Sequence, residues 1–216
     1  MEKKDGPHAA KSKVVKEEAL WTGKWLKVEQ TTYLDPKGQI RTWETVKRTT
    51  RTASCGTDGV AIMAILKRTL HHDCLLLVKQ FRPPMGCYTI ELPAGLVDSG
   101  ETVQAAALRE LQEETGYHAE ITGVSPVLCL DPGISNCTEL LVSAVINGDD
   151  PENRRPQQEL DEGEFIEVLL VPVNELLQKL TEMSNKGMVV DARVHIYAMA
   201  LVQATAKPNL LPLLKA

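Results

Sequence analysis

Three glutamates at helical spacing are the residues of this sequence with the clearest chemical potential. Glu110, Glu113 and Glu114 would share one face of a helix, within about 100° of arc. Like charges this close repel one another, and the stretch from Asp98 to Glu120 holds six acids and one arginine, a net charge of −5 that equals the formal charge of the whole chain. Residue types alone leave two interpretations open: a solvated helix face, or a site where a divalent cation neutralises the acids. Carboxylate oxygens of this kind suit Mg²⁺ or Mn²⁺.

A helix has to bring these acids together, and the apolar residues around them predict one. Val103, Ala107, Leu108 and Leu111 recur at the spacing of a helix face that packs on a core. We therefore expect a helix over about Thr102–Thr115 whose acidic residues lie on a different face from its core residues.

The rest of the chain mixes strands with helices. The apolar runs GVAIMAIL and CLLLVKQF predict two paired strands, with the pair His71-His72 as structural residues in the turn between them. Further strands are expected near Thr122–Leu130, Glu139–Ile146 and Phe165–Val171, and further helices near Val173–Met183 and Asp191–Thr205. This pattern predicts an α/β domain. The polar segment Asn147–Glu164 is long for a loop, and loops of that length are usually functional or disordered.

A small β appendage is expected before this domain. From Lys24 to about Thr50, apolar and polar residues alternate on both sides of Asp35-Pro36-Lys37-Gly38. Proline and glycine stand at suitable turn positions there, so the segment predicts a hairpin.

Composition excludes several classes of protein. The pI near 5.6 rules out a generally basic nucleic-acid-binding surface, and no apolar run approaches the roughly 20 residues that cross a bilayer. The first residues, MEKKDGPHAAKSK, contain no apolar stretch typical of a secretory signal. Five cysteines without CxxC spacing favour reduced thiols over disulfides or zinc. We therefore expect a protein of the cytosol and nucleus, with no nucleic acid and no membrane as partner.

The order of residues around the acids resembles a known motif at every position. From Gly95 to Tyr117 the sequence reads Gly-x5-Glu-x7-Arg-Glu-U-x-Glu-Glu-x-Gly-U, where U is a bulky apolar residue, and this is similar to the Nudix box. The resemblance implies a Nudix α/β/α sandwich with a mixed sheet. It also implies Mg²⁺-dependent hydrolysis of a nucleoside diphosphate linked to another moiety, with Mn²⁺ as a possible substitute.

The same resemblance assigns roles within the box. Metal ligation falls to Glu110 and Glu114, with Glu113 assisting and the carbonyl of Ala94 completing the set. Arg109 and Glu101 orient the carboxylates. Glu164, in Gly163-Glu164-Phe165, matches a carboxylate that serves as general base or further metal ligand.

The assignment of Glu164 has rivals. Asp161, Glu162 and Glu167 lie close to it in the sequence. The acidic tract Glu159–Glu162 also departs from the pattern of the family, so the conformation of this loop does not follow from the resemblance.

Segments outside the box resemble the ADP-ribose hydrolase branch of this family. They are GKWLKVEQTTYLDPKG, RTWETVKRTTR, LVKQFRPPMG, ELPAGLVDSGE, LDPGISNCTE and INGDD, and the likeness runs from about Trp21 to about Lys207. It implies a dimerisation appendage over residues 14–57 and a hydrolase domain over 58–207. Residues 1–13, which are charged and small and lie outside the likeness, are expected to be disordered, and residues 208–216 are expected to be a tail.

In that branch a homodimer builds each active site. The resemblance implies that Trp25 and Trp43, from different subunits, stack on either side of the adenine. Without it, both tryptophans read as hairpin core or interface residues. Arg48 and Arg82 match phosphate-binding positions, for which a planar guanidinium is suited. The other matched substrate-proximal residues are Glu91, Asp131 and Leu96, the last through its backbone.

The leading hypothesis is hydrolysis of ADP-ribose to AMP and ribose 5-phosphate, with other ADP-sugars as lesser substrates. A second keeps the chemistry but takes an oxidised nucleoside diphosphate such as 8-oxo-dGDP as the main substrate. A third is a Nudix module that binds ADP-ribose without cleaving it. The complete set of Arg109, Glu110, Glu113 and Glu114 argues against the third.

Overall fold

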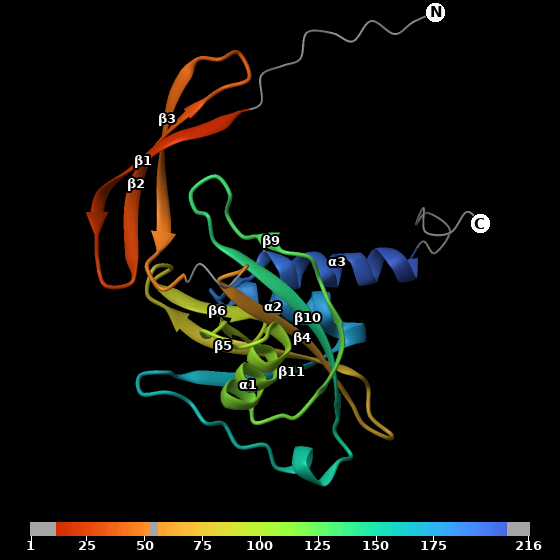
Figure 1. Cartoon of the computed structure of the whole chain (residues 1–216). Helices are drawn as coiled ribbons and strands as arrows, with labels where there is room; N and C mark the ends of the chain where they lie inside the picture. The colour runs from red at the N-terminus through yellow and green to blue at the C-terminus, as the bar shows by residue number, and fades with distance from the viewer. Residues whose placement is uncertain (1–11, 52–55, 207–216) are drawn as a thin grey trace, which may run out of the picture. The chain divides into compact units, whose positions relative to one another are not determined.

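The computed structural model describes residues 12–51 and 56–206, which form two compact units (Figure 1). Of the described residues, the small unit comprises 12–51, 56–58 and 127–139, and the large unit comprises 59–126 and 140–206. The expected tail over 208–216 lies outside the described residues, as do residues 1–11 of the expected disordered N-terminus.

The small unit contains a three-stranded antiparallel sheet. Its strands are β1 (Lys13–Thr22), β2 (Leu26–Leu34) and β3 (Ile40–Arg48), in the order β1-β2-β3. The expected turn between β2 and β3 is present: the Gly38 amide donates to the Asp35 carbonyl at 2.9 Å, and Gly38 has a φ of 75° that favours glycine. The Asp35 carboxylate accepts from the amides of Lys37 and Gln39.

The strand β1 was not expected from the sequence. All ten of its residues are exposed, so it shows no alternation of buried and exposed side chains from which a strand could be predicted. It is nonetheless paired along its length with β2, with register shifts between Val14 and Lys16 and between Ala19 and Trp21.

A mixed sheet is the centre of the large unit. Its strands run in the order β12-β6-β5-β4-β10-β8, with β11 paired to β5 and β7 paired to β4. Their bounds are β4 (Gly59–Lys67), β5 (Cys74–Arg82), β6 (Cys87–Glu91), β7 (Ala94–Leu96), β8 (Glu120–Val124), β10 (Thr138–Asn147), β11 (Ile166–Pro172) and β12 (Val189–Val190). The short β12 is parallel to β6, whereas β5 is antiparallel to β4, β6 and β11.

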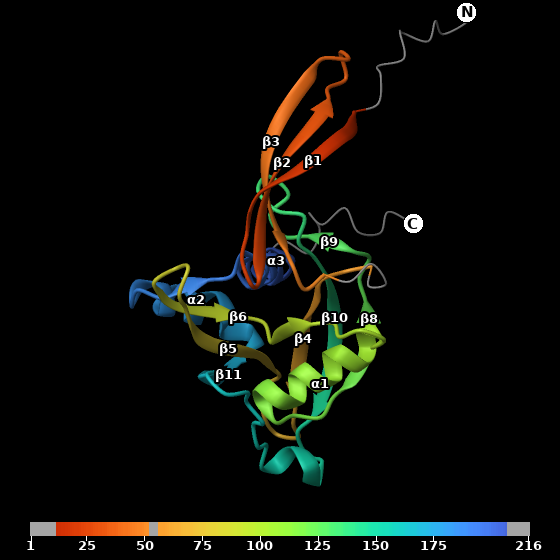
Figure 2. The ribbon, with the colours of Figure 1, turned by 60° about the vertical axis from the view of Figure 1, so that its left-hand side comes forward.

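Helices cover both faces of this sheet (Figure 2). One face carries α1 (Val103–Thr115), and the other carries α2 (Leu176–Asn185) and α3 (Ala192–Ala206). Short 3-10 turns lie at η1 (Pro151–Arg154) and η2 (Val173–Glu175). Because successive strand residues point to opposite faces, Ile62 belongs to the buried cluster that contains Leu111 of α1, whereas its neighbour Ala61 belongs to the cluster that contains Leu180 of α2. The α/β/α arrangement with a mixed sheet confirms the expected fold class.

The expected elements are largely present, with differences at their ends. The helix over Thr102–Thr115 and the paired strands of the two apolar runs are confirmed. The strand expected near Thr122–Leu130 is instead two strands, β8 and β9 (Leu128–Cys129), separated at Pro126, which has no amide hydrogen to donate to a sheet. The strands β6, β7 and β12 have at most five residues and gave no periodic signal. No helix of residues 12–51 and 56–206 is long and apolar enough to cross a membrane.

Candidate active site

Both ends of α1 are fixed by local interactions. The hydroxyl of Thr102 accepts from the Ala105 amide at 3.2 Å and caps the N-terminus. At the other end, Gly116 has a φ of 74°, and its amide donates to the Gln112 carbonyl. A Cβ atom at Gly116 would lie 2.3 Å from the backbone nitrogen of Gln157. Glycine is therefore required there for two reasons, the left-handed backbone and the close approach of the loop.

Arg109 holds the acidic residues of the box together. Its Nε and Nη2 atoms donate to the two carboxylate oxygens of Glu101, both at 3.0 Å. Its Nη1 atom donates to Glu110 at 2.9 Å and to Glu113 at 3.0 Å, and Nη2 also donates to the Leu96 carbonyl at 3.1 Å. Hydrogen bonding to Glu101 lowers the pKa of that carboxyl. One guanidinium thus orients three carboxylates, as charge-assisted forked hydrogen bonds allow.

Glu114 is the most enclosed acid of the group. It is 5% exposed, and its Oε2 atom accepts from the Ala94 amide at 3.1 Å. Burial raises the pKa of Glu114 to about 8, and the negative charges of Glu110 and Glu164 act in the same direction. The ionised carboxylate therefore lacks compensating positive charge.

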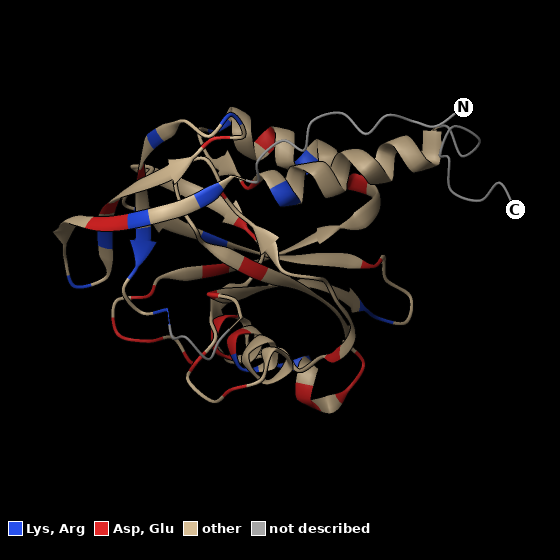
Figure 3. Cartoon of the chain, turned by 45° about the horizontal axis from the view of Figure 1, so that its top comes forward, with Lys and Arg blue, Asp and Glu red and all other residues tan. Residues whose placement is uncertain are grey.

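The Glu110 carboxylate lies close to the backbone of Gly95. A Cβ atom on Gly95 would come within 2.2 Å of three atoms of the Glu110 carboxylate group. Burial raises the pKa of Glu110, and the charges of Glu113 and Glu164 raise it further, whereas Arg109 lowers it. Figure 3 shows acidic residues gathered along α1.

Among the candidate acids Asp161, Glu162, Glu164 and Glu167, Glu164 is one whose negative charge acts on this cluster. The negative charge of Glu164 raises the pKa of Glu110, Glu114 and Arg82. At the two glutamates burial raises the pKa more, and at Arg82 the hydrogen bonds to Glu91 raise it more. Glu167 instead pairs with Lys79 at 2.7 Å.

The chemistry of this donor set fits a hard divalent cation. Glu110 and Glu114 are enclosed acids with raised pKa values, and a cation would supply the missing positive charge. In residues 12–51 and 56–206, no three His, Cys, Asp or Glu side chains already form a metal-binding group. The carboxylates would therefore converge by side-chain rotation when a cation binds.

A second charged group stands beside the acids. Arg82 donates to Glu91 from Nε at 2.9 Å and from Nη2 at 2.8 Å. Burial raises the pKa of Glu91, but the hydrogen bonds from Arg82 and Thr89 outweigh burial, so the pKa is lowered overall. Thr89, which no pattern in the sequence singles out, donates from its hydroxyl to the Glu91 carboxylate. Residues 89 and 91 point to the same face of β6, but this strand of five residues is too short to be predicted from the sequence.

The remaining predicted site residues belong to the small unit. Trp25 and Trp43 are 61% and 52% exposed. The Trp43 indole donates from Nε1 to the Gly133 carbonyl at 2.9 Å, in the turn that begins at Asp131. Arg48 is exposed at the end of β3, opposite Leu26. Trp43 thus contacts the turn that begins at Asp131, whereas Trp25 and Arg48 lie at the open end of the β2–β3 hairpin, away from its Asp35–Gly38 turn.

The register of β2 and β3 separates the two tryptophans. Trp43 is opposite Thr31, whereas the Trp25 carbonyl accepts from the Thr49 amide. Six residues of strand between Trp25 and Thr31 correspond to roughly 20 Å. Two rings that stack on both faces of one base are only about 7–8 Å apart, twice an aromatic contact distance. The backbone positions of Trp25 and Trp43 are thus farther apart along the hairpin than two rings that enclose one base.

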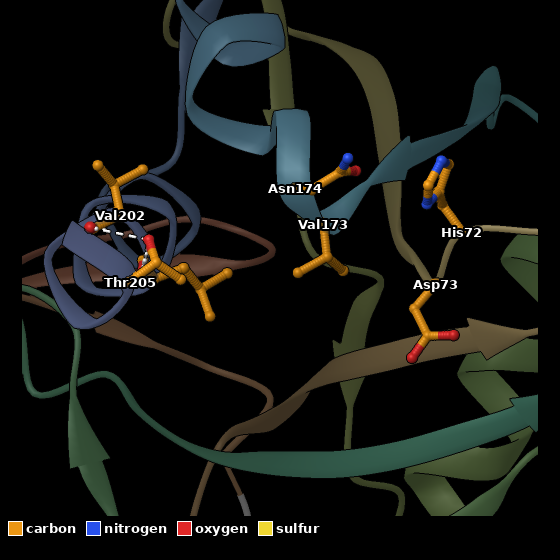
Figure 4. A pocket seen from close by; sticks show the side chains of 7 residues that line it. His72, Asp73, Val173, Asn174, Val202 and Thr205 are labelled. Carbon is orange, nitrogen blue, oxygen red and sulfur yellow. Dashed lines mark hydrogen bonds between the residues drawn. The ribbon is translucent and has the colours of Figure 1, made fainter. Parts of the chain in front are cut away.

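A hollow of the large unit lies away from these acids. This cavity of about 410 Å³ is lined by His72, Asp73, Val173, Asn174, Leu201, Val202 and Thr205. Figure 4 shows His72 and Asn174 on one side of it and the α3 residues Val202 and Thr205 on the other. None of these residues belongs to the predicted site.

Comparison with known proteins establishes the class of protein to which this site belongs. Residues 57–191 match the NUDIX domain, and the chain belongs to the Nudix family. The family generally depends on a divalent metal ion.

Particular relatives extend over most of the chain. It is 52% identical over 203 residues to the ADP-sugar pyrophosphatase of Mus musculus, covering 94% of this chain and 93% of that protein. It is 41% identical over 182 residues to the ADP-ribose pyrophosphatase of Saccharomyces cerevisiae, covering 84% and 78%. The fold is similar to that of a crystal structure described as an ADP compounds hydrolase, with a TM-score of 0.64, 22% identity, and coverage of 94% of this chain and 98% of that one.

Proposed function

We propose that the protein hydrolyses the pyrophosphate of ADP-ribose and other ADP-sugars, yielding AMP and a sugar phosphate, with Mg²⁺ or Mn²⁺ as the cofactor. The observation that carries this proposal is the pair of enclosed acids Glu110 and Glu114 on α1, whose pKa values are raised by burial and raised further by the charge of Glu164. The relatives named as ADP-sugar and ADP-ribose pyrophosphatases support the substrate class.

The metal ligands in this proposal are Glu110 and Glu114, with Glu113 and Glu164 and the Ala94 carbonyl completing the set. When bound, the divalent ion neutralises charge on the pyrophosphate and favours ionised water as the nucleophile. Arg109 has a catalytic role because it keeps Glu101, Glu110 and Glu113 oriented.

In this proposal, separate residues carry out proton transfer and phosphate binding. Glu164 is exposed at the edge of the acidic group and would accept a proton from the attacking water. Arg82 uses its Nε and Nη2 atoms for Glu91, which leaves the Nη1 side of the guanidinium for a phosphate oxygen. Leu96 would contact the substrate through its backbone, whose carbonyl also anchors Arg109.

We propose further that the protein is a homodimer whose small units complete the active sites. In that arrangement Trp25 and Trp43 from different subunits stack on adenine, and Arg48 and Asp131 bind near them. The separation of roughly 20 Å between the tryptophans along one hairpin supports a clamp made from two chains. Residues 14–57 would then be the dimerisation appendage and residues 58–207 the hydrolase domain.

The exposed surface of the β1–β3 sheet supports the same proposal. Val15, Leu20, Trp21 and Ile40 are each more than half exposed, and an apolar sheet surface of this kind is typical of an interaction site. We also propose that the protein resides in the cytosol and nucleus and binds neither nucleic acid nor membranes. The free thiols of Cys74, Cys87, Cys129 and Cys137 support a reducing compartment.

Substrate profiling tests the proposed activity. ADP-ribose, ADP-mannose, 8-oxo-dGDP and a nucleoside triphosphate would be compared at equal concentration with Mg²⁺, with products identified by mass. We expect the highest kcat/KM for an ADP-sugar, with AMP as a product. A higher kcat/KM for 8-oxo-dGDP would overturn the substrate class. Binding of ADP-ribose without turnover would make the protein a sensor.

A further inference from the structure

One glutamine side chain connects two segments that carry candidate active-site residues. Gln158 lies in the loop between β10 and β11. Its Nε2 atom donates to the Glu114 carbonyl at 2.6 Å and to the Ile166 carbonyl at 3.0 Å. The first acceptor belongs to α1, which carries the acids of the box, and the second is the first residue of β11. Both amide hydrogens of this side chain are therefore used to join the helix to the strand.

Neighbouring backbone contacts hold the loop against the same end of α1. The Glu159 amide donates to the Glu113 carbonyl at 2.8 Å, and the backbone of Gln157 lies within contact of Gly116. The last carbonyls of a helix have no partner within the helix and must find donors elsewhere. The loop supplies two of these donors, one from a backbone amide and one from Gln158.

The loop held in this way contains Glu164. Ile166 follows Glu164 by two residues, and the Glu164 carboxylate accepts from the Asp161 amide at 3.2 Å. Gln158 and Ile166 are the two ends of the short segment that carries Glu164, and the charge of Glu164 acts on Arg82, Glu110 and Glu114. Gly163, with a φ of 93°, adopts a backbone conformation that favours glycine within this segment.

We infer that Gln158 is a positioning residue for Glu164, fixing the strand end that carries this carboxylate at a set separation from the acids of α1. The inference rests on the proposed function, in which Glu164 acts on the water or the metal. A misplacement of about 1 Å at a reacting group can lower a rate by up to about 10²-fold, so loss of this connection should reduce turnover. A residue that served only as a helix cap would affect stability and leave the reactivity of Glu164 unchanged.

The test compares Gln158→Met with a matched control, Gln157→Met. Methionine keeps the length of the side chain and removes both donors, whereas the Gln157 amide donates only locally, to the Pro156 carbonyl at 3.0 Å. For ADP-ribose with saturating Mg²⁺, we expect Gln158→Met to lower kcat by ~10-fold with KM within about twofold of wild type. Gln157→Met should retain wild-type kcat. Gln158→Glu places a hydrogen-bond acceptor against the two carbonyls and should lower kcat at least as much as Gln158→Met. It replaces Gln158→Met in this test if the methionine variant does not fold.

A double-mutant cycle with Glu164→Gln separates positioning from a structural role. If Gln158 acts through Glu164, Gln158→Met should change kcat by less than about twofold in the Glu164→Gln background, because the group that it positions is already lost. Hydrogen–deuterium exchange of the metal-free protein gives a readout that does not depend on activity. Gln158→Met should accelerate exchange at the amides of Glu159, Asp161 and Glu164, and Gln157→Met should not.

Two failures can be told apart. If Glu164→Gln lowers kcat while Gln158→Met leaves it unchanged, or lowers it additively in the double variant, the inference is wrong and the proposed function stands. If wild-type protein does not hydrolyse ADP-sugars, or Glu164→Gln leaves kcat unchanged, the role of Glu164 is wrong and the inference falls with it.

Discussion

The two units of this protein are stabilised by different interactions. Among the described residues, every buried hydrophobic side chain belongs to the large unit, from Val60 to Ala198. The three-stranded sheet of the small unit instead has Glu29 and Thr31 as its buried residues and exposes Trp21, Trp25 and Trp43 by more than half. The large unit thus has a core of its own, whereas the small sheet presents its apolar residues outward.

Because of this difference, we expect the large unit to supply the residues for hydrolysis and the small unit to supply the residues that select the base. The acids of the box are held by neighbours on α1 and β7, all within the large unit. The aromatic residues proposed to bind the base stand on a sheet without an apolar core, and sheets of this size are marginal in isolation. Hydrolysis should therefore depend on the large unit, and base recognition on how a small unit is completed by a partner chain.

The largest effect should come from the acids of α1. We expect Glu110→Gln or Glu114→Gln to lower kcat by at least ~10²-fold, because removal of a neutralising ligand removes at least ~2.7 kcal/mol of transition-state stabilisation. Steady-state kinetics over a range of Mg²⁺ concentrations measures this effect. Glu182→Gln, at an exposed acid of α2, is the matched control and should behave as wild type. Wild-type rates for both box variants at low Mg²⁺ would refute the ligand assignment.

The buried carboxylate of Glu114 should make the metal-free protein sensitive to pH. Its folded-state pKa of about 8 lies above the usual value of 4.5, so between these values the folded protein retains a proton that the unfolded chain releases. Stability must then fall as the pH rises, by about 2–3 kcal/mol between pH 5.5 and 8. Urea unfolding in the presence of a chelator measures it, and Glu114→Gln should flatten the dependence. Equal slopes in both proteins would contradict the burial of a protonated Glu114.

Substitutions of the two tryptophans test the role of the small unit in base recognition. Trp25→Ala or Trp43→Ala should raise KM for ADP-ribose by roughly 10- to 100-fold, equivalent to ~1–3 kcal/mol of lost stacking. The change in kcat should be smaller, because stacking occurs in both the ground and transition states.

Mixing the two tryptophan variants sharpens this test. If the clamp combines two chains, random heterodimers have one site with both substitutions and one with neither, so about a quarter of all sites recover tight binding. Mass spectrometry would establish that subunits exchange. Exchange without recovered affinity would show that each clamp is built within one chain.

The smallest effect should come from the ion pairs of the small sheet. Lys47 on β3 donates to Glu17 of β1 at 2.6 Å and contacts Glu29 of β2 at 2.7 Å. Lys47→Met should destabilise the sheet by about 1 kcal/mol, seen as faster hydrogen exchange in β1–β3. The more exposed pair of Lys16 and Glu18 supplies the control, since Lys16→Met should change exchange less. Equal exchange in both variants would refute a special role for Lys47.

The same ion pairs predict an acid sensitivity of opposite sign to that of Glu114. Hydrogen bonds from Lys27 and Lys47 lower the pKa of Glu29. A depressed carboxyl pKa contributes stability above the usual value near 4.5, and this contribution is lost as the pH falls through the lower, folded-state value. The protection factors of amides in β1–β3 of the wild type, corrected for the intrinsic pH dependence of exchange, should therefore fall below about pH 4.5, and Lys47→Met should show less of this fall.

The sequence predicted the parts of this protein that depend on local pattern. The helix over Thr102–Thr115, its acidic face and the strands of the two apolar runs follow from spacing alone, because helical and strand periods place side chains on defined faces. The Asp35–Gly38 turn follows from proline and glycine at their usual positions. The box pattern then identified the family, and with it the chemistry of the acids.

Only the tertiary structure decided which distant residues meet. The sequence left Asp161, Glu162, Glu164 and Glu167 as rivals, and the fold brings the charge of Glu164 to Glu110 and Glu114 while Glu167 pairs with Lys79. It also joined Gln158 to carbonyls 44 and 8 residues away. Contacts of this kind depend on how loops close over a packed sheet, which no local period records. The pKa of Glu114 likewise follows from burial by the whole large unit, a property that its sequence neighbours do not determine.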